Sequence, residues 1–455
     1  MKSEDPIRAW SDRFEAFQKE RVGGSDSCDA LRREAFEQFS EAGFPSTRQE
    51  AWRYTNVKRI QQLNYATGPA NEITPDSSGF PDAEQIERLC VPLFACSLFV
   101  FVNGRFAPQL STPENLRGGL QVQGLSQTLA SADGAGIQRL GSQVDLKAHP
   151  FAALNTAFLE DGAVIHLPSN ESVSQPIHVA FVSVASEQPR VSHPRVLVVA
   201  EAGSRASVIV DHVSIGDAER FTNSVIEVFA EANASLDLVL LQREADTDIH
   251  VSNLSVQVER DARVATHTLT LGGAIVRNDL YSTLVGNGAE ITLNGLFLGT
   301  ASRLVDNHTC VDHAVPHCQS RQLYKGILAD ESRGIFRGRV IVRPGAQKTD
   351  AWQSNPNLLL GAGAEVNTRP QLEIRANDVK CRHGTTVGRL DEEALFYLRS
   401  RGIGEDAARF LLTQGFAQEV TAALPLPALG EHVRELLLER LLGGAGERLG
   451  TGDER

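Results

Sequence analysis

Cysteine is scarce in this sequence and follows no pairing pattern. The 455 residues contain six cysteines, at positions 28, 90, 96, 310, 318 and 381. So few thiols in a chain of this length do not make a disulfide framework, and unpaired thiols are typical of a reducing compartment. The sequence has no CxxC motif, which excludes a thioredoxin-type redox pair and a zinc ribbon.

Basic residues are fewer than acidic residues in this sequence. Lysine and arginine number 44 against 57 aspartates and glutamates, which gives a formal net charge of −13 and an isoelectric point of about 5.5. A protein that binds a nucleic-acid duplex needs a basic face that displaces counterions. We therefore expect no nucleic-acid partner.

Long apolar runs are also missing. The mean hydropathy is −0.18, and the most apolar stretch, residues 91–102, is interrupted by Pro92 and Ser97. A helix that spans a bilayer needs about 20 consecutive apolar residues, so no membrane segment is expected. The N-terminal residues MKSEDPIRAW lack the apolar region of a signal peptide, which predicts a cytoplasmic protein.

Two common catalytic motifs are absent. The sequence has no GxxxxGK[ST] motif, so it lacks the phosphate-binding loop of an ATPase. It also has no GxSxG motif, which excludes a hydrolase built on that nucleophile turn. Carboxylates suited to glycoside or uronic-acid chemistry are numerous, but one sequence cannot show which of them pair.

The chain divides into three regions of different predicted secondary structure. Residues 1–150 form a helical and mixed α/β region, with a helical pattern over residues 11–40 and a predicted strand over residues 98–106. Residues 151–388 open with a short helical piece and then read as β throughout, in short runs rich in β-branched residues. Residues 389–455 are predicted to be helical.

A weak repeat runs through the β region. Aligning Ser204, Ala234, Ala262 and Ala289 gives spacings of 30, 28 and 27 residues, and Ala346 lies 57 residues further on. Two strands and a tight turn with a small residue per repeat indicate the coils of a β-solenoid. A β-sandwich is the alternative, because its strands recur at similar intervals.

The C-terminal region contains several helix signals. DEEALFYLRSRG begins with the N-cap residue Asp391, and EDAARFLLTQGFAQEVTAAL follows it. In HVRELLLERLL an apolar stripe of Val433, Leu437 and Leu441 is widened by Leu438 and Leu442. These helices either pack in a small bundle or dock another protein, and the tail from residue 443 onward is predicted to be disordered.

The densest group of metal-ligand types is NHTCVDHAVPHC. It contains His308, Cys310, Asp312, His313, His317 and Cys318. Thiolates and imidazoles suit zinc, iron or copper. On a strand, however, the first three side chains share one face and His313 points to the other, so a structural or interface role is the alternative.

Two other groups stand out. Cys381 and His383 lie two residues apart in NDVKCRHGTTVG, and in an extended segment both point to one side. Lys380 and Arg382 are expected to favour the Cys381 thiolate. From the pattern alone, a buried structural cysteine is the alternative. Trp52 and Tyr54, in QEAWRYTNV, are predicted to anchor a small N-terminal core rather than a ligand cage.

The segment NDVKCRHGTTVGRLDEEALFYLRSRGI closely resembles the signature of the SufD family, subunits of the SUF iron–sulfur cluster assembly scaffold. GAQKTDAWQSNPNLLL, NTRPQLEI, SRQLYKGILADESRGIFRG and, near the N-terminus, PSTRQEAWRYTNV are also similar to that family. The resemblance spans nearly the whole chain and is densest over residues 306–402. The related SufB family shares the general plan, but its central cysteine motifs are not evident here.

The resemblance implies a right-handed parallel β-helix core with N-terminal α/β and C-terminal helical regions. It implies a non-catalytic scaffold that pairs with SufB through the β-helices and binds the SufC ATPase through residues 389–455, while SufC hydrolyses the ATP. By motif, Cys381 and His383 match the metal ligands that hold iron or a nascent cluster together with SufB, and His383 is the stronger candidate. No cofactor is expected to be held firmly by the isolated chain.

Several alternatives stay open. The chain is either a ligand-bearing subunit or a purely structural partner of SufB, and in isolation it could form a homodimer. A β-solenoid polysaccharide lyase or hydrolase is the enzyme alternative. The sequence does not decide whether the isolated chain binds iron, a cluster or a flavin.

Overall fold

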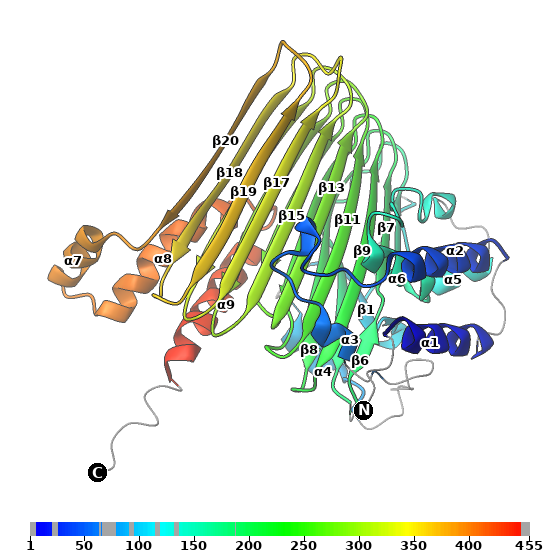
Figure 1. Ribbon diagram of the computed structural model, residues 1–455, viewed down its shortest axis with the longest axis horizontal. Helices are drawn as coiled ribbons and strands as arrows, with labels where there is room; N and C mark the ends of the chain where they lie inside the picture. Colours follow the sequence, from blue (N-terminus) through cyan, green and yellow to red (C-terminus); the bar gives the residue numbers. More distant parts are fainter. Residues whose placement is uncertain are drawn as a thin grey trace.

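Two ten-stranded sheets face each other along most of the chain and form a parallel β-solenoid (Figure 1). The computed structural model describes residues 6–20, 26–62, 65, 79–90, 95–113, 119–131, 136–186 and 188–446. Successive strands of a coil alternate between the two sheets, and strands of successive coils pair in parallel. The predicted solenoid is confirmed, and the sandwich alternative is wrong.

The strands of each sheet follow the order of the coils. In the first sheet the order is β2 (Arg105–Phe106), β1 (Ser97–Val102), β5 (Ile177–Val184), β8 (Arg205–Ile215), β10 (Ser235–Arg243), β12 (Arg263–Thr270), β14 (Glu290–Gly299), β16 (Gln319–Leu328), β18 (Asp350–Leu359) and β20 (Lys380–Gly388). In the second it is β19 (Glu365–Ile374), β17 (Arg333–Val342), β15 (Leu304–His313), β13 (Ile275–Leu284), β11 (Ile249–Val258), β9 (Arg220–Ala230), β7 (Arg195–Ala200), β4 (Gly162–Leu167) and β3 (Gln121–Gly124), with β6 (Arg190–Ser192) beside β9.

The repeat found in the sequence equals the register of the coils. Ser235 pairs with Arg205 and Arg263, and Arg263 pairs with Glu290, so the offsets are the predicted 30, 28 and 27 residues. The small residue just before each of these strands is buried in a tight turn; these are Ser204, Ala234, Ala262 and Ala289. At β18 this position belongs to Thr349 rather than to the predicted Ala346, because the preceding turn is longer.

The interior of the solenoid is apolar over much of its length. Inward-facing residues such as Ile165, Val198, Val228 and Leu238 are fully buried in one continuous cluster. No coil could bury its apolar face alone, so stacking creates the core. Burial of a leucine, valine or isoleucine side chain contributes about 1.5–3 kcal/mol, and the stack therefore gains stability with each added coil.

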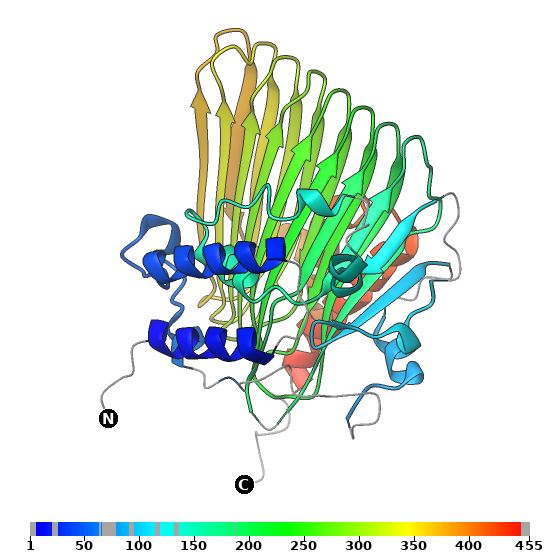
Figure 2. The same ribbon diagram turned by 90° about the vertical axis from the view of Figure 1, so that its right-hand side faces the viewer.

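Helices of the N-terminal region cover the outer face of the second sheet (Figure 2). They are α1 (Pro6–Glu20), α2 (Asp26–Ala42), α3 (Lys58–Gln62), α5 (Leu125–Ser131) and α6 (Pro150–Ala157). Helix α4 (Ala83–Leu89) packs on the first sheet instead. Three short 3-10 helices are η1 (Glu50–Trp52), η2 (Pro108–Leu110) and η3 (Ile137–Arg139). The aromatic rings of α1 and α2 pack around Trp10 and Phe39 against β9 and β11.

The strand predicted over residues 98–106 is instead a hairpin. β1 and β2 run antiparallel and are joined by Asn103 and Gly104, whose φ angles are 49° and 86°. Two consecutive residues with positive φ form the tight turn that matches the strand twist, and Asn-Gly is the preferred pair there. β1 also pairs in parallel with β5, so it belongs to the solenoid rather than to a separate N-terminal unit.

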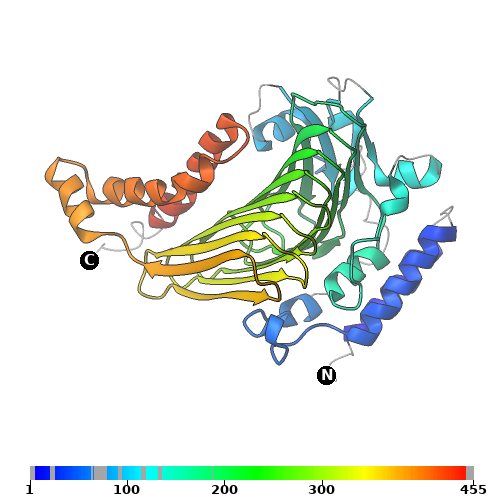
Figure 3. The same cartoon turned by 90° about the horizontal axis from the view of Figure 1, so that it is seen from above.

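The C-terminal helices lie on the other side of the solenoid (Figure 3). There α8 (Glu405–Thr421) and α9 (Pro427–Gly446) pack against the first sheet, whereas α7 (Glu392–Ser400) packs against α8. Asp391 caps α7 as predicted, since its Oδ1 accepts a hydrogen bond from the backbone N–H of Glu393 at 2.9 Å. No helix among the described residues is long and apolar enough to cross a membrane.

Two details of the C-terminal predictions change. Val433 and Leu437 are buried against the sheet, but Leu438 is exposed, so the apolar stripe is narrower than predicted. The side chain of Leu442 lies outside the described part of the chain. The predicted disordered tail begins too early, because α9 continues to Gly446; residues 447–455 lie outside the described residues.

Candidate functional site

The last coil of the solenoid leaves one strand edge of each sheet without a neighbour. β20 ends the first sheet and β19 ends the second, and no described strand pairs with the outer edge of either (Figure 3). The side chains of both strands are exposed or half-buried, unlike the buried residues of earlier coils. An open strand edge is a template for pairing with another chain, so this end of the solenoid is a candidate interface.

Cys381 and His383 lie on this terminal strand, as predicted. In the register with β18, Cys381 is opposite Ala351 and His383 is opposite Gln353. Both β18 residues are buried in the interior, so Cys381 and His383 occupy the inward-facing positions of β20. Since no further coil covers them, Cys381 is half-buried and His383 is exposed.

The prediction that Lys380 and Arg382 favour the Cys381 thiolate, and so lower its pKa, is wrong. Burial raises the pKa of Cys381, and the carboxylate of Asp350 raises it further. Lys380 and Arg382 point to the opposite face of the strand, where their charges help to lower the pKa of Asp350 instead. Cys381 therefore stays a protonated thiol in the isolated chain at neutral pH.

A residue that the sequence did not single out lies beside His383. Gln353 is fully buried, and its Nε2 donates a hydrogen bond of 2.6 Å to Oε1 of Gln322. Nε2 of Gln322 donates in turn to Oγ1 of Thr309, also at 2.6 Å. The amide Oε1 of Gln353 is buried and has no hydrogen-bond partner among the described residues. The sequence signal for this hydrogen-bonded row of Gln353, Gln322 and Thr309 was the presence of glutamines at inward-facing positions in a region rich in β-branched residues.

The NHTCVDHAVPHC segment does not gather its six candidate ligands. His308 and Cys310 lie on the outer face of β15, where Nε2 of His308 is 2.9 Å from Oδ1 of Asp306. His313 points inward, with Nε2 at 2.9 Å from Oγ of Ser320. Cys318 fills the small-residue position of a solenoid turn. The segment follows the geometry expected of a strand and not that of a single metal site.

The rest of this segment is held by surface and cleft contacts. Asp312 forms an ion pair with Arg343 at 2.6 Å, and His317 lies in the turn before β16 with a φ of 62°. Cys310 lines a cleft of about 420 Å³ together with Tyr281, Arg337 and Arg339. Burial raises the pKa of the Cys310 thiol, although a hydrogen bond from Arg339 opposes the shift.

Trp52 and Tyr54 have different roles. Trp52 is buried, with the guanidinium of Arg277 3.8 Å from its ring centroid, so it anchors the N-terminal segment as predicted. Tyr54 is 40% exposed, and its hydroxyl accepts a hydrogen bond from Asn367 on β19. It is therefore a surface contact of the terminal coils and not a core anchor.

Comparison with known proteins finds matches over most of the chain. The family model of the SufBD core domain, described as SUF system FeS cluster assembly, matches residues 181–416, and that of the SufBD N-terminal region matches residues 11–179. The iron–sulfur cluster assembly protein SufD of Escherichia coli is 32% identical over 97% of this chain and 98% of its own length. The protein of the same name from Bacillus subtilis is 24% identical over 89% of this chain and 91% of its own length. An iron–sulfur cluster assembly SufBD family protein of Synechocystis is 29% identical over 91% of this chain and 89% of its own length.

Proposed function

The chain belongs to the SufBD family of SUF-system iron–sulfur cluster assembly proteins, and we propose that it is a non-catalytic scaffold subunit that pairs with SufB and carries ligands for a nascent cluster. The observation that carries this proposal is the position of Cys381 and His383. They are the inward-facing residues of the last strand, at an edge with no strand neighbour among the described residues. None of the six cysteines forms a disulfide, which fits a cytoplasmic location, because thiols stay reduced there.

A thiolate and an imidazole at successive inward-facing positions of β20 can bind iron. In this proposal the cluster is the product that the scaffold assembles and hands on, not a cofactor that it keeps. A thiol must lose its proton to become a ligand, so binding iron at Cys381 releases a proton. The raised pKa of Cys381 therefore opposes metal binding by the isolated chain. A SufB strand along β20 would supply further ligands. Imidazole ligation at His383 supports release as well as capture, because a cluster with four thiolate ligands is harder to transfer.

The C-terminal helices support docking of the SufC ATPase. Phe396 and Tyr397 of α7 are 74% and 57% exposed, and Leu411 of α8 is 45% exposed. The α7 helix extends away from the solenoid beside α8, on the side opposite the N-terminal helices (Figure 3). Clustered exposed apolar side chains on a projecting helix pair are typical of an interaction surface. In this proposal SufC supplies the ATP hydrolysis.

The decisive experiment measures cluster formation on the complex. SufB, SufC and this chain would be co-purified anaerobically, and iron and acid-labile sulfide would be measured. We expect His383→Ala and Cys381→Ser to leave assembly intact but to lower the cluster yield. Thr385→Ala, on the same inward face of β20, is the matched control. Full yield from the double variant Cys381→Ala, His383→Ala would instead favour a purely structural partner of SufB.

The two interfaces can be tested separately. Val387→Lys on β20 places a charge at the open edge and should weaken pairing with SufB while SufC still binds. Phe396→Glu should weaken SufC binding while SufB still pairs. Val285→Lys, in an exposed turn at the far end of the strands, is a control that should affect neither. The size of the isolated chain in solution shows whether the same edge also forms a homodimer.

A further inference from the structure

Three potential metal ligands converge inside the solenoid, far from the terminal coil. They are His212 on β8, Glu244 in the loop after β10 and His250 on β11. Each offers one ligand atom, and these atoms all lie within 4.8 Å of one another. The side chains are buried, with exposures of 5%, 1% and 2%. They are the one such group of three among the described residues.

The carboxylate of Glu244 is held in place by polar neighbours. Oγ1 of Thr222 donates a hydrogen bond of 2.7 Å to Oε1, and Nε2 of Gln242 donates one of 3.2 Å to Oε2. Nδ1 of His250 is also 2.7 Å from Oε2. Hydrogen bonds of this kind from outside the ligand set are what orient the carboxylate ligands of protein metal sites.

The ion-pair partner of this buried carboxylate is His250, which is charged only when it is protonated. Among the described residues, no lysine or arginine forms an ion pair with Glu244. The guanidinium of Arg220 is instead paired with Asp248 at 2.9 Å. A buried carboxylate is costly unless a positive charge or hydrogen bonds compensate it. A bound cation would compensate the charge of Glu244 without protonation of His250.

His212 supplies the observation that points to a ligand. Its side chain is only 5% exposed, yet it forms no hydrogen bond to any described residue. Its ring stacks on Phe181 at a centroid distance of 5.1 Å and meets the ring of His250 edge-on at 4.8 Å. These contacts fix the imidazole next to the other two ligands.

We propose that His212, Glu244 and His250 bind a divalent first-row transition metal ion inside the solenoid. Two imidazoles and one carboxylate suit Zn²⁺ or Fe²⁺ and leave positions open for water. Mg²⁺ and Ca²⁺ are disfavoured, because they prefer all-oxygen ligands. The ion supplies the positive charge that Glu244 lacks, while Thr222 and Gln242 keep the carboxylate oriented.

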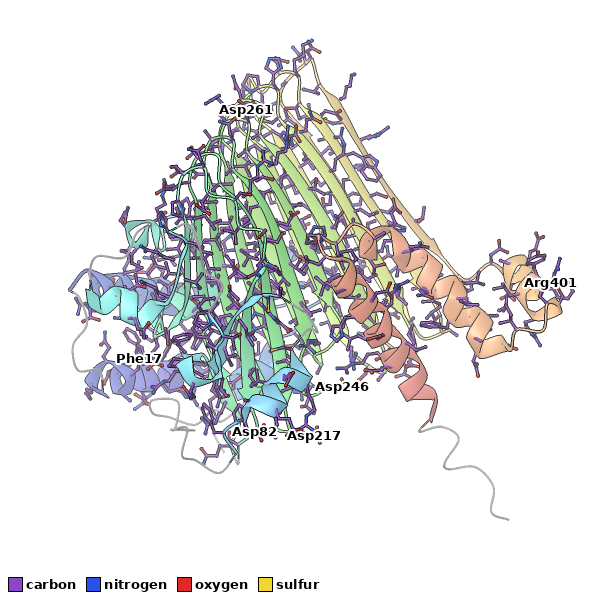
Figure 4. All side chains as sticks on the ribbon, turned by 180° about the vertical axis from the view of Figure 1, so that it is seen from behind. Phe17, Asp82, Asp217, Asp246, Asp261 and Arg401 are labelled. Atoms are coloured by element: carbon purple, nitrogen blue, oxygen red, sulfur yellow. The ribbon has the colours of Figure 1, made fainter. Side chains whose placement is uncertain are left out.

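The proposed ion is separate from the cluster site at the last coil. Five strands of the first sheet, β10 to β18, lie between β8 and β20. Six strand spacings of about 4.8 Å separate β8 from β20 by roughly 29 Å across the sheet, so the two sites are at least that far apart. Glu244 lies two residues before Asp246, and the loops of Asp217 and Asp246 lie at the same rim of the solenoid (Figure 4). By joining two strands and a loop from different coils, the ion would tie this rim together.

The test uses the full chain after treatment with a chelator. Anaerobic titration with Co²⁺ should produce visible d–d absorption that saturates at one equivalent, and Zn²⁺ should displace it. His212→Gln, Glu244→Gln and His250→Gln should each weaken Co²⁺ binding by roughly 100-fold, since each removes a ligand from a three-ligand site. Zn²⁺ should raise the Tm of the wild-type chain but not that of the variants.

Two control variants show whether the Co²⁺ signal comes from these three residues. His267→Gln replaces another buried histidine, whose ring faces Asn294 on the outer side of the sheet, and should bind Co²⁺ normally. The double variant Cys381→Ser, His383→Ala should also bind normally. A folded wild-type chain without a saturable Co²⁺ spectrum would overturn the proposal, as would a spectrum that survives all three ligand substitutions or disappears in the Cys381, His383 variant.

Discussion

Replacing Arg277 tests the contact that ties the N-terminal segment to the solenoid. This side chain is 2% exposed and bonds both oxygens of Asp279, at 2.8 and 2.9 Å, and Oδ2 of Asp306, at 2.8 Å. It also donates a hydrogen bond to the backbone carbonyl of Ala51 and lies over the ring of Trp52. Arg277→Met keeps much of the side-chain volume but leaves two buried carboxylates without their cation.

The expected loss of stability in Arg277→Met follows from the buried negative charge that is left uncompensated. Removing one partner of a buried ion pair typically costs about 3–5 kcal/mol in the free energy of unfolding. Arg333→Met is the matched control, because Arg333 forms an ion pair with Glu365 in which both side chains are more than 60% exposed. Exposed pairs of this kind contribute about 1 kcal/mol or less.

The pH dependence gives a second, independent signature. Burial would raise the pKa of Asp306, but Arg277 and His308 hold it down at about 2. The wild-type chain therefore keeps this contribution above pH 3.8 and loses it as the pH falls toward 2. Without Arg277 the pKa of Asp306 rises, so the variant recovers stability as this carboxylate takes up a proton. The gap in the free energy of unfolding between the two chains should narrow by up to about 1.4 kcal/mol per pH unit.

Urea unfolding at about pH 7 and about pH 4.5, followed by tryptophan fluorescence and circular dichroism, measures both effects. If Arg277→Met costs no more than Arg333→Met at neutral pH, the buried network does not carry the stability assigned to it. A gap that does not narrow at the lower pH would contradict the electrostatic reasoning, since a lost packing contact does not depend on carboxylate protonation.

Two further predictions concern two buried histidines and a glycine in a tight turn. Burial lowers the pKa values of His267 and His313 to about 4, so below pH 6.5 the unfolded chain binds protons that the folded chain does not. At about pH 5 each histidine should cost about 2 kcal/mol of stability, and replacement by asparagine should flatten this pH dependence in urea unfolding. Gly286→Ala should lower the Tm by several degrees, because a Cβ there would lie 2.0 Å from the backbone nitrogen of Arg260. Gly384→Ala, with nothing within 4 Å, should leave the Tm nearly unchanged.

The solenoid could be predicted because one requirement repeats in every coil. The turn before each strand of the first sheet brings its last residue into the interior, where only a small side chain fits, as at Ser204, Ala234 and Ala262. That requirement produces a periodic signal that survives sequence divergence. Ala346 was misplaced because the turn before β18 is longer, and a change in turn length shifts the alignment without changing the fold.

The contacts between coils could not be predicted in the same way. His212, Glu244 and His250 come from one strand, a loop and another strand, and their spacings of 32 and 6 residues match no ligand motif. The direction of the Cys381 pKa shift was missed for a related reason. Sequence neighbours such as Lys380 and Arg382 point away from a strand residue, whereas residues of the adjacent coil surround it.

In the proposed function, the same inward-facing position serves packing in β18 and ligation in β20. Ala351 and Gln353 of β18 are buried because β20 lies over them, while Cys381 and His383 occupy the same positions one coil later with no described strand over them. A strand added along β20 would cover these two side chains as β20 covers those of β18. It would remove water from a thiol whose pKa burial already raises, so the thiol could form a thiolate only if a metal ion took the place of the proton. In the proposed complex, closure of the edge by itself would therefore oppose metal binding at Cys381, and the ligands that the added strand brings would have to offset that cost.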